Sequence, residues 1–277
     1  MMRNSKGFTL VELMIAATVT GIMGVALTQM LIHNSRFVAH TEAMMNARQV
    51  ARAAMNVMGA ELAMVSTGAF IGVPSATSIT LRVPFAFGII CDQATQRIAS
   101  LVPTDSVMFA SASADGLAWR NDASEEYTLM TVSNVSTTTD HANEHKCTDQ
   151  GIAILTDGKM IKMTITPDTL SIGDVFYLYQ EVRYQFASSA DLTGRLGLWR
   201  KRGSDADEEI LAPFDNASGF AFFVGSAATA QASPPSDLTT VVGLELNLVG
   251  SSEVTPLNSS QPPSFEISTR VNFLTNQ

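Results

Sequence analysis

A run of 20 residues without an ionisable side chain, residues 13–32, constrains this chain more than any other feature. At about 1.5 Å per residue, a helix of this length spans about 30 Å, the thickness of the hydrocarbon core of a bilayer. Arg3 and Lys6 precede the run, and basic residues before an apolar segment favour an N-terminus that stays in the cytoplasm. The sequence therefore predicts a membrane-spanning helix, with the remainder of the chain exported.

Two ordinary explanations of such a run fit less well. A secretory signal peptide ends at a small-residue cleavage site, which Ala16-Ala17-Thr18 could mimic, but the apolar run continues well past it. Neither a signal peptide nor a plain transmembrane anchor has a use for Glu12, because a carboxylate in an apolar segment is costly.

The segment Lys6-Gly7-Phe8-Thr9-Leu10-Val11-Glu12 resembles the class III signal of type IV pilins and type II secretion pseudopilins. The match consists of a basic leader, Gly7 before the cut, Phe8 after it, and Glu12 as the fifth residue of the mature chain. The resemblance implies that residues 1–7 are a leader, that a membrane peptidase cuts between Gly7 and Phe8, and that Phe8 becomes N-methylated. We expect Glu12 to set subunit register by pairing with the N-terminal amine of a neighbouring Phe8.

The helical pattern continues beyond the apolar run, since no proline occurs before Pro74. Apolar residues recur at helical spacing along one side, at Met44, Ala47, Ala51, Ala54, Met58, Leu62 and Val65. The pattern predicts one helix from about Phe8 to about Val65. Residues 8–35 form its membrane or filament-core half, and residues 36–66 form an amphipathic half that needs a sheet to cover its stripe.

Residues 67–277 have the character of a β-rich domain. Short β-prone runs alternate with turn signals, and their spacing suits antiparallel strands better than βαβ units. The predicted strands are residues 78–84, 152–156, 159–166, 175–186, 196–200, 219–224, 239–249 and 265–274, with a two-residue Asp157-Gly158 hairpin turn between the second and third. The predicted fold class is α+β, in agreement with the type IV pilin fold that the N-terminal resemblance implies.

The size and a few internal segments point to a subgroup. Val182-Arg183-Tyr184, Leu198-Trp199-Arg200-Lys201 and Ser268-Thr269-Arg270-Val271 resemble the larger minor pilins of the PilW type. The same segments are also similar to the J-type minor pseudopilins of type II secretion. Both alternatives remain open at this point.

The charge balance argues against nucleic acid as a partner. The net charge is −9, and removal of Arg3 and Lys6 with the leader gives −9 − 2 = −11, whereas neutralising phosphates needs Lys and Arg. The only basic patch that we identify holds Arg195, Arg200, Lys201 and Arg202 near Trp199. A membrane-anchored adhesin or DNA-binding module is therefore kept only as an alternative of another class.

Two segments contain residue types that can bind metal ions, but their spacing matches no known metal-binding motif. Asp205, Asp207, Glu208 and Glu209 are weak candidates for a Ca²⁺ site, expected in a turn. A transition-metal site could draw on Asp140, His141, Glu144, His145 and Cys147, although a surface loop explains that segment better. Thr131 to Thr139, just before it, has the composition of a loop or an edge strand.

Cys91 and Cys147 are the only cysteines. Two thiols in an exported domain usually pair, so we expect a disulfide, with two free or buried thiols as the alternative. The sequence shows no G-x-S-x-G elbow, P-loop or H-E-x-x-H motif. We therefore expect neither an enzyme nor a cofactor.

The resemblance implies a minor pilin that primes assembly of a type IV pilus or sits at its tip. The implied partners are other minor pilins, the major pilin, the prepilin peptidase, the inner-membrane assembly platform, and membrane lipid before assembly. The implied location is the inner membrane in a single pass, with a cytoplasmic N-terminus and a periplasmic C-terminal domain, and then the pilus at the cell surface. The alternative is a minor pseudopilin of a type II secretion system.

Overall fold

The computed structural model describes residues 9–102, 109, 114–120, 127–138, 146–152, 159–257 and 259–274 of the 277-residue chain. One long helix, α1 (Leu10–Leu62), precedes all the strands, and a short 3₁₀ helix, η1 (Leu238–Thr240), lies among them. The strands are β1 (Ser78–Ile90), β2 (Arg97–Leu101), β3 (Gly116–Arg120), β4 (Tyr127–Thr138), β5 (Met160–Thr166), β6 (Val175–Ser188), β7 (Leu196–Arg202), β8 (Glu208–Phe214), β9 (Gly219–Val224), β10 (Val241–Ser251) and β11 (Ser264–Asn272). The predicted α+β class, a long helix followed by a large antiparallel sheet, is confirmed.

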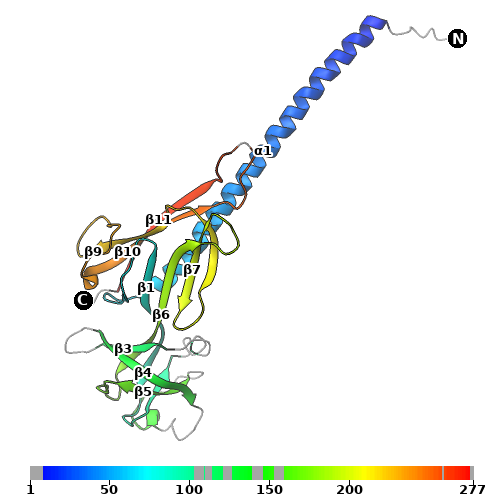
Figure 1. Ribbon diagram of the computed structural model, residues 1–277. Helices are drawn as coiled ribbons and strands as arrows, with labels where there is room; N and C mark the ends of the chain where they lie inside the picture. The colour runs from blue at the N-terminus through cyan, green and yellow to red at the C-terminus, as the bar shows by residue number, and fades with distance from the viewer. Residues whose placement is uncertain are drawn as a thin grey trace, which may run out of the picture.

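The helix is slightly shorter than predicted. It begins after Thr9, which adopts an extended conformation as the N-cap, and ends at Leu62 with Ala63 as the C-cap. Met64 and Val65 continue as turns whose N–H groups donate to the carbonyls of Glu61 and Leu62. The helix projects from the domain, and its N-terminal part extends away from the strands (Figure 1).

The long strands β1 and β6 divide the domain into two regions. They pair with each other from Ser78↔Gln185 to Ile89↔Val175, with a register shift between Pro84 and Ala86. On one side of that shift, β6 continues through β7, β8 and β10 to β11, and we call this region the helix-facing sheet. On the other side the pairing β1–β2–β5–β4–β3–β6 returns to β1, which closes a small barrel.

This closed region, which we call the distal barrel, lies at the end of the domain farthest from the start of α1 (Figure 1). It consists of β2, β3, β4 and β5 with residues 86–90 of β1 and 175–179 of β6. Its core is separate from that of the helix-facing sheet and includes Ile90, Leu101, Leu117, Ile161 and Phe176. The core of the helix-facing sheet instead joins α1 to the strands, with Met58, Leu62, Leu81, Tyr184 and Leu246 among its members.

Three observed strands have no counterpart in the sequence predictions: β2, β3 and β8. All five residues of β2 are buried, so it lacks the alternation that marks a half-buried strand. β8 begins with two glutamates and contains Pro213, both of which are depleted in strands. The segment from Thr131 that was expected to be a loop or an edge strand belongs to β4, which pairs with both β3 and β5.

The predicted hairpin is wrong for the residues that the structure describes. Met160 lies opposite Ser100 of β2 and also opposite Thr138 of β4, so β5 is paired along both edges where the hairpin partner would lie. Asp157-Gly158 and residues 153–156 lie outside the described residues. Closure of the barrel brings distant strands to both edges of β5, and a local turn signal cannot anticipate that.

Candidate functional site

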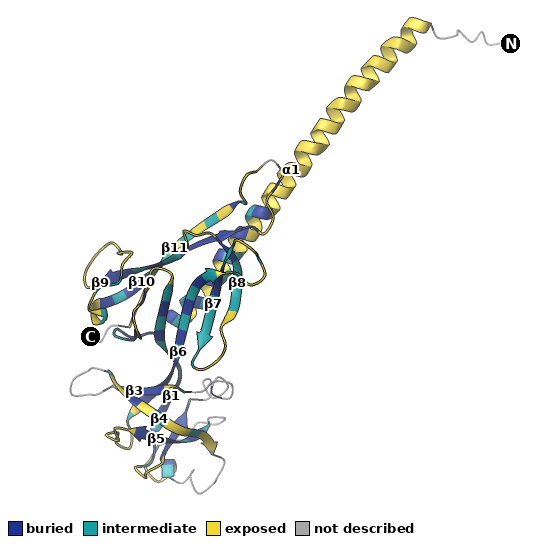
Figure 2. Ribbon diagram, viewed as in Figure 1, coloured by how far each residue is buried: buried dark blue, intermediate teal, exposed yellow. Residues whose placement is uncertain are grey.

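The N-terminal part of α1 presents an apolar surface that the rest of the chain leaves uncovered. Every residue from Leu10 to Glu42 is exposed, including Ile22 at 71% and Leu31 at 69% (Figure 2). By length and composition α1 can cross a membrane. We call this part of α1 the free half. An apolar helix surface of this size needs lipid or neighbouring helices around it.

A capping box fixes the start of this half. The Thr9 hydroxyl accepts a hydrogen bond from the backbone N–H of Glu12 at 3.3 Å. In return, the Glu12 carboxylate accepts from the Thr9 backbone N–H and from the Thr9 hydroxyl, each at 2.9 Å. This arrangement satisfies orphan donors of the first turn and holds the carboxylate at the helix N-terminus, where the helix dipole favours a negative charge.

The rest of α1, which we call the docked half, buries a stripe of small and apolar side chains against the helix-facing sheet. Its buried members are Ala43, Ala47, Ala51, Ala54, Met58 and Leu62. The stripe agrees with the predicted positions except at its start, where Ala43 is buried and Met44 is only half-buried. The small alanine side chains allow the helix backbone to approach β10 closely at Gly250. A Cβ at position 250 would lie 2.3 Å from the Ala47 carbonyl oxygen, so the contact requires glycine there.

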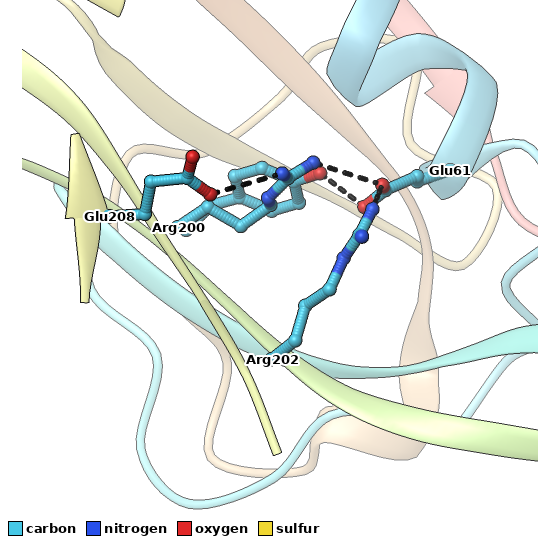
Figure 3. Close-up of polar contacts among 5 residues, drawn as sticks. Glu61, Arg200, Arg202 and Glu208 are labelled. Carbon is cyan, nitrogen blue, oxygen red and sulfur yellow. Dashed lines mark hydrogen bonds and ion pairs between the residues drawn. The ribbon is translucent and has the colours of Figure 1, made fainter. Parts of the chain in front are cut away.

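A charged cluster attaches the last turn of α1 to the sheet (Figure 3). The Glu61 carboxylate accepts hydrogen bonds from Arg202 at 2.5 Å, from Arg200 at 3.4 Å, and from the hydroxyl of Tyr184. Arg200 also pairs with Glu208 at 3.4 Å. Because α1 has no basic residue in its last turn, these two arginines supply the positive charge near its negative end.

The cluster is substantially shielded from water. The side chains of Glu61 and Arg200 are each 18% exposed, and Tyr184 is fully buried. Burial, and then the adjacent Glu61 carboxylate, raise the pKa of the Tyr184 phenol far above its ordinary range. Tyr184 therefore remains a hydrogen-bond donor, and the cluster fixes α1 relative to β6 and β7.

The structure joins Cys91 and Cys147 by a disulfide, with 4.6 Å between their Cα atoms. Both residues are buried, and they pack with Ile98 of β2 and Met160 of β5. The bridge thus lies in the distal barrel, far in the fold from the helix. A salt bridge between Lys146 and Asp92 at 2.5 Å lies beside it and lowers the pKa of the Asp92 carboxyl.

Three of the four carboxylates proposed for Ca²⁺ have separate partners. Asp207 pairs with Arg183 at 2.5 Å and Glu208 pairs with Arg200. Glu209 accepts a hydrogen bond from the Ala190 N–H at 2.8 Å. The two glutamates lie on β8 and not in the expected turn, which leaves Asp205 and Asp207 before the strand. Among the described residues, no group of three His, Cys, Asp or Glu side chains is placed to hold a metal ion.

The other candidate residues fall into two groups. Gly7, Phe8, Asp140, His141, Glu144 and His145 lie outside the described residues. In the basic patch, Arg200 and Arg202 contact Glu61, so carboxylates already neutralise part of the charge that a phosphate backbone would need.

Two functional contacts were missed at the level of sequence. The capping box has a readable signal, the T-x-x-E spacing of Thr9 and Glu12 directly before an apolar run. The Glu61 cluster has no such signal, because Arg200 and Arg202 follow Glu61 by about 140 residues and meet it only through the fold.

Comparison with known families identifies the start of the chain. A family model described as the prokaryotic N-terminal methylation motif matches residues 2–28. The chain carries a prepilin methylation motif. The matched region contains Gly7, Phe8 and Glu12 and extends into the free half of α1. No curated protein and no solved structure gives a significant match to the chain.

The motif and the architecture agree with each other. A long N-terminal helix with an uncovered apolar half, followed by an antiparallel sheet domain, is consistent with a type IV pilin-like fold. The motif supports a structural subunit of pilin or pseudopilin type. It implies processing by a prepilin peptidase, anchoring in a membrane and assembly with other pilin-type subunits.

Proposed function

We propose that this protein is a minor pilin of the PilW type, which primes assembly of a type IV pilus or sits at its tip. The observation that carries the proposal is the free half of α1, an exposed and mainly apolar helix that begins within the methylation motif. Lipid covers this surface before assembly, and the helices of neighbouring subunits cover it afterwards. The sheet and the distal barrel then coat the filament core.

Processing creates the charge that assembly uses. The peptidase cuts between Gly7 and Phe8 and methylates the new amine of Phe8. In the isolated chain, the Glu12 carboxylate is held by Thr9 at the helix N-terminus. In the filament it pairs with the Phe8 amine of a neighbour, and a slipped subunit leaves both charges unpaired in an apolar core, which selects the register.

The partners and location follow from the same mechanism. The N-terminus lies on the cytoplasmic side of the inner membrane, since Arg3 and Lys6 precede the apolar run, and the domain lies in the periplasm. The partners are other minor pilins, the major pilin, the prepilin peptidase and the inner-membrane assembly platform. The disulfide between Cys91 and Cys147 suits this exported location.

The second candidate function is a minor pseudopilin of a type II secretion system. The methylation motif and the long helix favour it equally, because both systems use the same signal. A DNA-binding module is less favoured, since Arg200 and Arg202 are committed to Glu61.

Co-purification tests the proposal and separates the two systems. A C-terminally tagged full chain is crosslinked in cells, solubilised in non-ionic detergent and captured, and the bound proteins are identified by mass spectrometry. We expect other minor pilins, the major pilin and the pilus platform. Capture of pseudopilins and secretion-platform proteins instead would transfer the function to the second candidate, and capture of neither set would contradict both.

A further inference from the structure

The distal barrel carries a pocket that filament assembly does not explain. Its volume is about 360 Å³, and its lining includes Phe87, Trp119, Tyr127 and Tyr177 together with the acidic residue Asp174. Aromatic residues make up 7% of the chain but dominate this lining, so the chemistry of the pocket differs from that of the average surface. Pockets that combine aromatic walls with a single placed charge are typical of ligand sites.

The rings are arranged as a floor with two walls. Tyr177 of β6 is 6% exposed and forms the floor, and the Phe87 ring of β1 lies 5.8 Å from it at 54°. The Tyr127 ring of β4 approaches Tyr177 to 5.3 Å at 59°. β1 and β3 flank β6 on opposite edges, and the small Ala118 of β3 lies between Tyr177 and the neighbouring β4, so the two walls stand on opposite sides of the floor.

The carboxylate at the pocket is held in place by a tight turn. Asp174 accepts a hydrogen bond from the Ser171 N–H at 2.6 Å, and its backbone carbonyl accepts from Ile90 at 3.0 Å. The Gly173 N–H donates to the Ile90 carbonyl at 2.8 Å. Gly173 has a φ of +95°, a backbone conformation that favours glycine. The turn therefore fixes Asp174, a residue of the pocket lining, before any ligand arrives.

We propose that this pocket binds a small organic cation, with a quaternary ammonium group as its best-fitting chemistry. Aromatic ring faces attract cations, quaternary ammonium groups are bound by aromatic cages, and Asp174 supplies the countercharge. The same face of the sheet already holds a cation in this way, since the Arg82 guanidinium lies 5.8 Å from the centroid of Tyr179, two residues along β6. The net charge of −9 also favours a cation over an anion.

The position of the distal barrel bears on whether the pocket is accessible in a filament. The distal barrel lies at the end of the domain farthest from the start of α1, so in a subunit at the tip of a filament built around the helices it would lie at the free end (Figure 1). Only this placement depends on the proposed function. Binding itself depends on the barrel, and it is measured on the isolated protein, so its failure would leave the assembly role untouched.

The test uses the full chain in a non-ionic detergent, with choline as the probe. Replacing Trp199, which lies outside the pocket, by Phe leaves Trp119 as the only tryptophan, so its fluorescence reports on the pocket. We expect a saturable change with choline. We also expect binding at least about tenfold weaker for the neutral analogue in which carbon replaces the nitrogen.

Two substitutions in this Trp199→Phe background locate the site. Tyr127→Leu removes a wall and Asp174→Asn removes the charge while keeping an acceptor for Ser171, and each should weaken choline binding about tenfold. Phe37→Leu and Asp237→Asn, at exposed positions outside the pocket, should leave it unchanged. Thermal melts followed by circular dichroism establish that each variant is folded.

Four outcomes would overturn the proposal. They are the absence of saturable choline binding, equal binding of the neutral analogue, unchanged binding in folded Tyr127→Leu and Asp174→Asn variants, and saturation by neutral monosaccharides in place of choline. The last result would reassign the pocket to sugars, for which ring stacking without a countercharge is sufficient.

Discussion

The two halves of α1 follow opposite packing rules within one unbroken helix. Leu31 in the free half is 69% exposed, and Leu62 in the docked half is fully buried. From Leu13 to Ile32 the free half has no ionisable side chain on any side, and no residue of the free half is buried by the described part of the chain. The docked half buries a single stripe and presents polar residues elsewhere. The residue types overlap, but their arrangement around the helix differs.

This difference indicates what kind of surface each half of α1 packs against. A one-sided stripe of alanines fits one rigid partner, the helix-facing sheet, and allows the close contact at Gly250. An all-round apolar surface fits surroundings that change, first lipid and then several helices. The docked half should therefore determine the stability of the domain, and the free half should determine assembly.

The largest effect is expected from Glu12→Ala in the free half. The variant should be inserted and cleaved normally, because Gly7 and Phe8 are intact. It should enter sheared pili about a hundredfold less than the unaltered chain, since the neighbouring amine loses its partner in an apolar core. Immunoblots of the sheared fraction measure this, with Glu42→Ala as the control acidic residue on the same helix. Glu12→Ala protein in pili at the unaltered level would show that the carboxylate is dispensable.

A matched pair of leucine substitutions compares the two halves directly. Leu62→Ala should lower the free energy of unfolding of the domain by about 2–5 kcal/mol, because a fully buried side chain leaves a cavity. Leu31→Ala should change it by less than about 0.5 kcal/mol. Denaturant titration in detergent measures both values. Equal effects at the two positions would mean that the free half packs on the domain.

Glu61→Gln tests the charged attachment of the docked half. The substitution keeps the shape of the side chain but removes the negative charge that Arg200 and Arg202 share. We expect the free energy of unfolding to fall by about 1–3 kcal/mol. The lower end of this range is expected because Arg202 is 36% exposed. Glu42→Gln, an exposed position on the same helix, should be neutral. If the two variants are equally stable, the cluster does not hold the helix to the sheet.

The smallest expected effect is a change in how the free energy of unfolding depends on alkaline pH. Burial, and then Glu61, raise the pKa of Tyr184, so the folded protein keeps this proton where the unfolded chain has lost it. The stabilising contribution is complete below about pH 10 and declines as the pH rises above it. In Tyr184→Phe, the loss of stability between about pH 10 and 11 should be smaller by about 1 kcal/mol. Identical pH slopes for the two proteins would contradict the raised pKa.

The helix and its two halves could be predicted because their signals are local. The stripe that ends at Leu62 repeats at helical spacing, and the apolar run is continuous in sequence. The capping box between Thr9 and Glu12 has an equally local signal in its T-x-x-E spacing, although it was not predicted. Long strands such as β6 and β10 were also found, since alternating buried residues mark them.

The distal barrel could not be predicted because its closure depends on distant partners. β6 pairs with β1 on one edge and with β3 on the other, and the short β2 shows no alternation. The same limit applies to the pocket. Phe87, Tyr127 and Tyr177 lie 40 to 90 residues apart in the sequence (127 − 87 = 40; 177 − 87 = 90) and meet only when the barrel closes.

Intact mass spectrometry of the protein purified from its own membrane tests the central proposal most directly, namely that the mature chain begins at a processed and methylated Phe8. Loss of the seven leader residues from 277 gives an expected chain of 270 residues (277 − 7), heavier by the CH₂ that N-methylation adds. The Cys91–Cys147 disulfide should make it lighter by two hydrogen atoms, which return on reduction. A chain that still begins at Met1 or Met2, or one that begins near Thr18, would contradict the proposal.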